Sequence, residues 1–145
     1  DINDDRHRGI FLHKVLGSVV HRGDLHVALK RQAYRYGLGT EEIERCGELL
    51  ERALSEERVK RWFEGFVRVA NERPLTAPGS LRRPDRVVWL PDGTVEVVDY
   101  KFGSTNHEAY REQVRDYVSL LADAGYPGAK GFLWFPVKNE IIRVV

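Results

Sequence analysis

The chain of 145 residues is poor in sulfur, with a single cysteine, Cys46, and no methionine. One cysteine excludes a disulfide framework within the chain and any zinc or iron–sulfur site built from four cysteines. A lone thiol fits a reducing, cytoplasmic setting. Because methionine is absent and the first residues read DINDDRHRG, we expect residues 1–7 to be a linker remnant. Residues 8–145 are then expected to form a single domain excised from a longer protein.

Long apolar runs and a strong net charge are also missing. No stretch approaches the roughly 18 apolar residues of a membrane-spanning helix, so we expect no membrane partner. With 23 lysines and arginines against 22 aspartates and glutamates, the formal net charge is only +1. Bulk charge therefore does not indicate nucleic acid, and any basic surface has to be local. The 42% of hydrophobic and 31% of charged residues are typical of one soluble globular domain.

Hydrophobic periodicity predicts mostly helices in the first part of the chain and mostly strands in the second. A mixed α/β fold follows, with a central sheet flanked by helices and a helical N-terminal segment. The predicted helices cover residues 8–20, 24–36, 40–55, 56–66 and 106–125. The predicted strands cover residues 66–75, 83–90, 94–102, 129–137 and 140–145.

The strands 83–90 and 94–102 are separated by a Pro-Asp-Gly turn. This turn suits a three-residue hairpin loop with Gly93 in the left-handed conformation, and the resulting register places Asp85 opposite Asp99. Directly opposed side chains have Cβ atoms about 4.5–5.5 Å apart. Two carboxylates at that distance repel each other unless a cation lies between them, and their oxygens suit Mg²⁺ or Mn²⁺.

Lys101 follows Asp99 by two residues and therefore shares its face of the strand. The same charges also fit a solvated sheet edge, on which Asp99 pairs with Lys101 while Asp85 pairs with Arg83 or Arg86. A register slip of one residue would turn Asp85 to the opposite face. The hairpin by itself thus leaves a metal site and a set of surface ion pairs both open.

Polar side chains also interrupt apolar surfaces elsewhere in the chain. Gln113 and Tyr117 lie one turn apart on the inward stripe of the last predicted helix, where they form either a structural network or part of the Asp99 site. His13 shares a predicted apolar stripe with Ile10 in the first helix, as a core histidine or as a metal ligand. Glu72, near the end of the first predicted strand, is either a further carboxylate of the sheet or a surface residue.

These features occur in a characteristic order: GIFLHKVL, Glu72, RPDRV, VVDYKFG and QVRDY. The ordered set resembles the RecB-like nuclease family of the PD-(D/E)xK, restriction-endonuclease-like superfamily, over residues 8 to about 135. It is most similar to the C-terminal nuclease domains of AddA- or RecB-type helicase–nuclease subunits. The resemblance implies a restriction-endonuclease-like mixed central sheet.

The resemblance also implies roles for the acidic and basic residues. Asp85 and Asp99 would bind Mg²⁺ or Mn²⁺, with His13 as an additional metal ligand. Lys101 would orient or activate the attacking water and offset charge in the transition state.

Further residues would support these groups. Gln113 and Tyr117 would hold the catalytic residues or the DNA backbone, and Glu72, which matches the family pattern loosely, is kept as a helper. Local basic clusters would bind DNA, unless they are ordinary solvated faces; they comprise Arg82, Arg83, Arg86, Arg111 and Arg115.

The activity implied by the resemblance is metal-dependent hydrolysis of DNA phosphodiester bonds. The domain would act within an ATP-dependent helicase/exonuclease of bacterial double-strand-break repair and recombination. Its partners would be DNA, helicase domains of the same parent chain and a second subunit. The iron–sulfur subtype is not expected, since Cys46 is the only cysteine, and without a G-x-x-x-x-G-K-[ST] loop we expect no ATP site in this piece. Two alternatives stay open: a catalytically silent nucleic-acid-binding or docking domain, and a stand-alone resolvase or restriction-type endonuclease.

Overall fold

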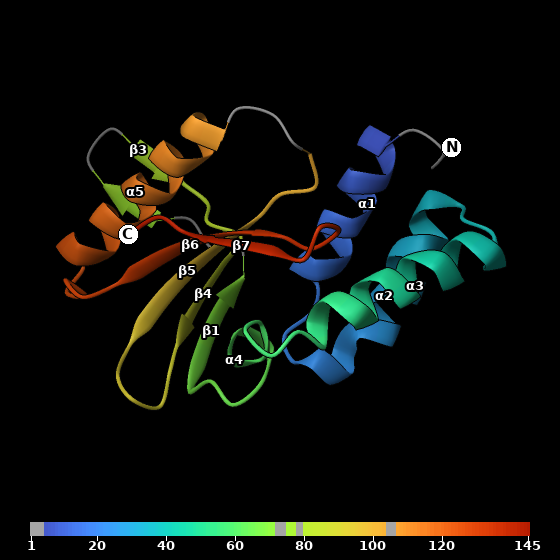
Figure 1. Cartoon of the computed structure of the whole chain (residues 1–145), viewed down its shortest axis with the longest axis horizontal. Coiled ribbons are helices and arrows are strands. Elements are labelled where there is room, and N and C mark those ends of the chain that lie inside the picture. Colours follow the sequence, from blue (N-terminus) through green and yellow to red (C-terminus); the bar gives the residue numbers. More distant parts are fainter. Residues whose placement is uncertain (1–4, 72–74, 78–79, 104–106) are drawn as a thin grey trace.

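The computed structural model describes residues 5–71, 75–77, 80–103 and 107–145. A five-stranded sheet forms the centre of the molecule, in the order β1-β4-β5-β6-β7 (Figure 1). Neighbouring strands are antiparallel except for β5 and β6, which are parallel and joined by helix α5 (His107–Asp123). The predicted mixed α/β sheet flanked by helices is thus confirmed. The strands are Arg68–Asn71 (β1), Arg86–Trp89 (β4), Val95–Tyr100 (β5), Lys130–Phe135 (β6) and Glu140–Arg143 (β7).

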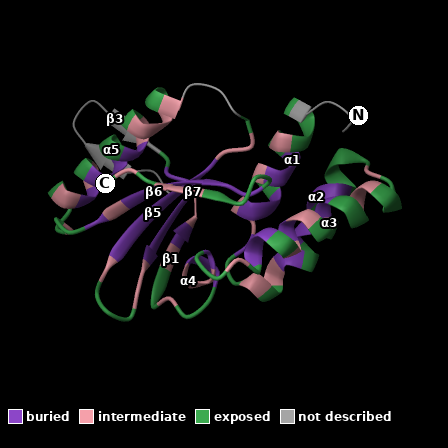
Figure 2. Cartoon of the chain, viewed as in Figure 1, coloured by how far each residue is buried: buried purple, intermediate pink, exposed green. Residues whose placement is uncertain are grey.

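Helices cover the two faces of the sheet differently. On one face, Val98 and Tyr100 of β5 pack with the N-terminal helices in one hydrophobic cluster. On the other face, Val97 packs with Val114 and Val118 of α5 in a second cluster. Figure 2 shows buried residues running through the central strands between these layers. The N-terminal helices are α1 (Asp5–Gly17), the short 3₁₀ helix η1 (Arg22–Asp24), α2 (Leu25–Tyr36), α3 (Thr40–Leu54) and α4 (Lys60–Phe63).

The β4–β5 hairpin has the register that its turn predicts. Trp89 lies opposite Val95, and the Leu90 amide donates to the Thr94 carbonyl oxygen at 2.9 Å. Gly93 closes the turn with a φ of 89°, a conformation that favours glycine. The hairpin therefore fixes which side chains emerge together at the other end of the two strands.

The first helix differs from its prediction at both ends and in its buried face. It begins at Asp5 rather than at the predicted residue 8, and it ends at Gly17. Its buried side chains include Phe11 and Val15, whereas Ile10, predicted on the apolar stripe, is 43% exposed. The inward face is thus rotated relative to the predicted stripe.

Two further predictions differ in length. The helix predicted over 56–66 shortens to α4, and the strand predicted over 66–75 begins only at Arg68 as β1, with residues 72–74 outside the described part of the chain. A separate antiparallel pair, β2 (Leu75–Ala77) and β3 (Ser80–Arg82), is not predicted by the sequence pattern. In the described part of the chain, no helix combines the length and apolar character that a membrane crossing requires.

Candidate active site

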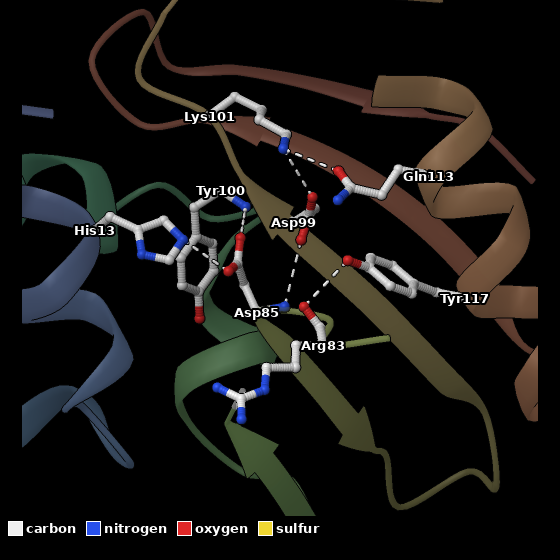
Figure 3. A network of polar contacts seen from close by, with 8 residues as sticks. All are labelled: His13, Arg83, Asp85, Asp99, Tyr100, Lys101, Gln113 and Tyr117. Atoms are coloured by element: carbon white, nitrogen blue, oxygen red, sulfur yellow. Dashed lines mark hydrogen bonds and ion pairs between the residues drawn. The ribbon is translucent and has the colours of Figure 1, made fainter. Parts of the chain in front are cut away.

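Two carboxylates meet where β4 begins and β5 ends (Figure 3). The ladder between the strands stops at Arg86 and Val98, and Asp85 lies in the bend just before it. The Asp85 amide donates to Asp99 Oδ1 at 3.3 Å, and the Tyr100 amide donates to Asp85 Oδ2 at 2.7 Å. Both aspartates are buried, at 7% and 2% exposure. The two carboxylates therefore lie side by side in a site largely shielded from water.

His13 brings a third potential ligand from the helical layer. Its Nε2 lies 2.7 Å from Asp85 Oδ1, although the two residues are 72 positions apart in the chain. The His13 side chain is 33% exposed, so the imidazole lies at the edge of the site rather than in the core. Asp85 thus pairs with His13, and not with Arg83 or Arg86 as the surface-edge interpretation required.

Lys101 lies on the opposite side of Asp99 from Asp85. Its amide donates to the Trp134 carbonyl oxygen at 2.8 Å, which extends the strand ladder and keeps Lys101 on the Asp99 face. Lys101 Nζ lies 3.0 Å from Asp99 Oδ2 and donates to Gln113 Oε1 at 3.1 Å. The ammonium also lies 4.3 Å from the centroid of the Tyr110 ring. An acid, an amide and an aromatic face together hold one cation in place.

Two residues of α5 support the site in different ways. Gln113 contacts Lys101 directly, whereas the Tyr117 hydroxyl donates to the main-chain oxygen of Arg83 at 3.1 Å. Tyr117 thereby holds the segment that leads into Asp85. Tyr110 was given no role from the sequence, although it lies on the same stripe as Gln113 and Tyr117. An aromatic residue one turn before an inward glutamine was the signal that could have identified it.

Ionising the buried Asp99 is costly. Burial raises the pKa of Asp99 to about 7, the neighbouring Asp85 charge adds to the increase, and Lys101 opposes it. A buried acid beside a second acid is stabilised in its charged form by any further cation that reaches it. The site therefore favours cation binding.

The donor types suit a divalent metal ion. Asp85 and Asp99 supply carboxylate oxygens and His13 supplies an imidazole nitrogen, a set compatible with Mg²⁺ or Mn²⁺. Across residues 5–71, 75–77, 80–103 and 107–145, no group of three or more such side chains is already arranged as a metal site. The residues thus fit a metal by chemistry, with His13 and Asp85 joined directly by a hydrogen bond.

The expected DNA-binding arginines occupy dissimilar environments. The Arg83 and Arg115 side chains are exposed, and Arg115 Nη1 lies 3.2 Å from Glu108 Oε1 on the same helix. Arg111 is half-buried. Arg82 ends strand β3, but its side chain is not among the described groups, and Glu72 lies outside the described residues.

Arg86 does not contact solvent at all, and the expectation that it binds DNA is corrected. Its side chain is fully buried, with its guanidinium 4.1 Å from the centre of the Phe63 ring. A buried arginine needs acceptors for its N–H groups, and here they come from several elements of the helical layer and the sheet. The acceptors are the carbonyl oxygens of Val19, Val20 and Trp62 and the side-chain oxygen of Asn71.

Arg86 directly follows Asp85 in the chain and connects the end of α1 to strand β4. Val19 and Val20 lie two and three residues beyond the end of α1, the helix that carries His13. Arg86 therefore ties the end of that helix to the strand beside Asp85, across the interface that His13 and Asp85 also bridge.

No protein-family model matches the chain, and no curated protein matches it either. The functional conclusion therefore depends on the geometry and chemistry of the residues described above.

Proposed function

We propose that this chain is a divalent-metal-dependent deoxyribonuclease that hydrolyses phosphodiester bonds of DNA. The observation that best supports the proposal is the grouping of Asp85, Asp99 and Lys101. At the end of the sheet the buried Asp99 carboxylate contacts the Lys101 ammonium on one side and accepts a hydrogen bond from the main-chain amide of the buried Asp85 on the other. Phosphodiester hydrolysis needs this combination, because an anionic ligand set must hold a metal beside a group that offsets phosphate charge.

Asp85 and Asp99, together with His13, are the residues that would hold Mg²⁺ or Mn²⁺. Such an ion polarises the scissile phosphate, lowers the pKa of a bound water and stabilises the leaving oxygen. Because Asp85 is held by the Tyr100 amide and Asp99 by the Asp85 amide, both carboxylates are oriented before anything binds. Such preorganisation reduces the rearrangement needed on binding.

Lys101 acts as a fixed positive charge in this proposal. Its ammonium is held by Asp99 and Gln113 and is 17% exposed, so it can contact both a water molecule and a phosphate oxygen. In that position it orients the attacking water and offsets the negative charge that develops on the phosphate. Gln113 positions Lys101, and Tyr117 positions the segment before Asp85.

The wider role belongs to the same proposal. The order of His13, Asp85, Asp99, Lys101 and the Gln113–Tyr117 pair along the chain supports kinship with RecB-like nucleases. In that setting the domain serves an ATP-dependent helicase/exonuclease of the bacterial cytoplasm that acts in break repair and recombination. DNA, the helicase domains of the parent chain and a second subunit are then its partners.

Cleavage of linear single- and double-stranded DNA tests the proposal. The assay compares Mg²⁺, Mn²⁺ and EDTA for the wild type, Asp99→Asn and Lys101→Met. Asp123→Asn and Lys30→Met are matched controls, since both residues are exposed and lie outside the site. We expect cleavage that requires metal, falls at least about a hundredfold in the two site variants and is unchanged in the controls.

Metal binding separates the remaining outcomes. If no cleavage occurs but calorimetry shows that Mn²⁺ binds to the wild type and not to Asp99→Asn, the site is a metal site whose activity needs the parent protein. If neither protein binds Mn²⁺, the nuclease proposal is wrong and a silent binding or docking domain is the better account. Cutting of closed circular DNA would instead favour a stand-alone endonuclease.

A further inference from the structure

A cavity of about 630 Å³ opens beside the candidate site, between α1 and the residues that follow β5. His13 and Lys101 line it, so the cavity is continuous with the site in Figure 3. Ile10 and Phe102 supply apolar lining, and Ile10 is 43% exposed. A cavity of this volume takes one small organic ligand rather than a folded partner.

The charged groups around the cavity are of one sign. Arg6 and Lys14 supply positive charge from α1, whereas the Lys101 ammonium is held by Asp99 and Gln113; no aspartate or glutamate is among the described residues that line the cavity. Arg6 and Lys14 are both exposed. A cavity with apolar lining and basic groups complements a ligand that has a flat, apolar part and a phosphate.

The α1 backbone and the segment after β5 come close together at one point of the cavity. Gly9 lies where a Cβ atom would come within 3.2 Å of Phe102 Cβ, so α1 and the segment after β5 approach closely there. The lining also includes Gly103 on the other side. A cavity of about 630 Å³ admits one base and its sugar, whereas the bases of a duplex are stacked and paired and enter a pocket only when turned out of the helix.

We infer that this cavity is a subsite for one unpaired nucleotide next to the scissile phosphate. The base packs against Ile10 and Phe102, and the phosphate of that nucleotide lies near Lys14 and Arg6. The inference depends on the proposed function, because His13 and Lys101 belong to both the cavity and the candidate site. It identifies the ligand class at this position as single-stranded nucleic acid.

Fluorescence anisotropy in EDTA measures this binding without cleavage. The probes are a labelled oligothymidylate, a strand of the same length built from abasic sites, and a duplex of that length. The variants are Ile10→Asp and Lys14→Glu. Val27→Asp and Lys30→Glu are matched controls, because these exposed residues of α2 make the same changes in charge outside the cavity. A thermal melt of each variant shows that it is folded.

We expect Ile10→Asp and Lys14→Glu to bind oligothymidylate roughly tenfold more weakly than the wild type, and the controls to stay within about twofold. The abasic strand should bind the wild type more weakly than oligothymidylate does. Ile10→Asp should change abasic binding less than oligothymidylate binding, since the lost contact is made to a base. Equal weakening of all three probes by Ile10→Asp, or no effect of either cavity variant, would overturn the inference.

Together with the cleavage and Mn²⁺-binding measurements, this experiment distinguishes failure of the subsite from failure of the nuclease proposal. Metal-dependent cleavage without base-dependent binding would leave the nuclease standing and remove the subsite. Base-dependent binding that Ile10→Asp abolishes, in a protein that neither cleaves DNA nor binds Mn²⁺, would support the subsite and reject the nuclease.

Discussion

The Lys101 ammonium donates a hydrogen bond to the amide oxygen of Gln113 at 3.1 Å, and this contact ties the end of β5 to the middle of α5. The same ammonium lies 3.0 Å from Asp99. Gln113 therefore acts on the proposed chemistry through Lys101, without touching either carboxylate in the described contacts.

Replacing Gln113 with leucine should lower kcat for DNA cleavage about tenfold, because Lys101 loses a fixed acceptor and samples more positions. The affinity for Mn²⁺ should stay within about twofold, since the metal-binding carboxylates are untouched. Gln113→Glu keeps an acceptor and should retain more activity, and the exposed neighbour Glu112→Leu is the control. An equal loss of Mn²⁺ affinity in Gln113→Leu would show that the residue supports the whole site and not Lys101 in particular.

Stability without metal should depend on pH through Asp99. Its pKa is raised from 3.8 to about 7 in the folded state, so between these values the folded protein holds a proton that the unfolded chain has released. The free energy of unfolding should therefore fall as the pH rises from about 4 to about 7, and this contribution should not change further above that range.

Urea unfolding in EDTA at a series of pH values measures this effect, and Asp99→Asn should remove the fall that Asp99 causes. Mn²⁺ should also release protons when it binds near pH 6, because it displaces the proton from Asp99. Wild-type and Asp99→Asn curves that run parallel across the whole range would contradict the assignment.

Gly131→Ala should destabilise the protein by about 1–3 kcal/mol. A Cβ atom on this β6 residue would clash with Val114 of α5 and would lie 2.9 Å from Val118 Cγ2. These valines adjoin Gln113 and Tyr117 in the chain, so the shift of α5 that relieves the clash also moves both site residues. Urea unfolding and cleavage rates should decline together, whereas Gly128→Ala, with open space at its Cβ, should change neither.

Arg86→Met should destabilise the protein on the order of 3 kcal/mol, because several buried carbonyl groups lose their donor. The exposed neighbour Arg83 provides the comparison, and Arg83→Met should change the free energy of unfolding by less than about 0.5 kcal/mol. Chemical unfolding of both variants is the measurement. Similar small changes in the two would mean that the buried guanidinium contributes little to the interface between α1 and the sheet.

The sequence predicted the hairpin well because its information is local. A Pro-Asp-Gly turn sets the register, and strand alternation then places Asp99 and Lys101 on one face. The next helix along the chain was expected to bring Gln113 and Tyr117 to the Asp99 site, and Gln113 there contacts Lys101. Local sequence patterns were thus sufficient to predict the part of the site formed by β5, the residues after it and α5.

The expectation that Arg86 binds DNA was wrong because its face of β4 is buried by helices that are distant in the sequence. Alternation puts it on the same face as Val88, but only the folded chain shows that the N-terminal helices cover this face and supply carbonyl acceptors. An arginine beside a proposed active site then looks like a DNA contact. The inward face of α1, with Ile10 on the outside, was missed for the same reason.

The site combines contributions from two layers of the fold. His13 reaches Asp85 from α1, whereas Lys101 and Gln113 meet on the opposite side of the sheet. The site is therefore held by two independent contacts, His13 with Asp85 and Lys101 with Gln113. A displacement of α1 by about one ångström would stretch the 2.7 Å contact between His13 and Asp85 beyond hydrogen-bond range. The contact between Lys101 and Gln113 would stay intact. A force applied to the N-terminal helices would thus separate His13 from Asp85, while the Lys101 ammonium would keep its position.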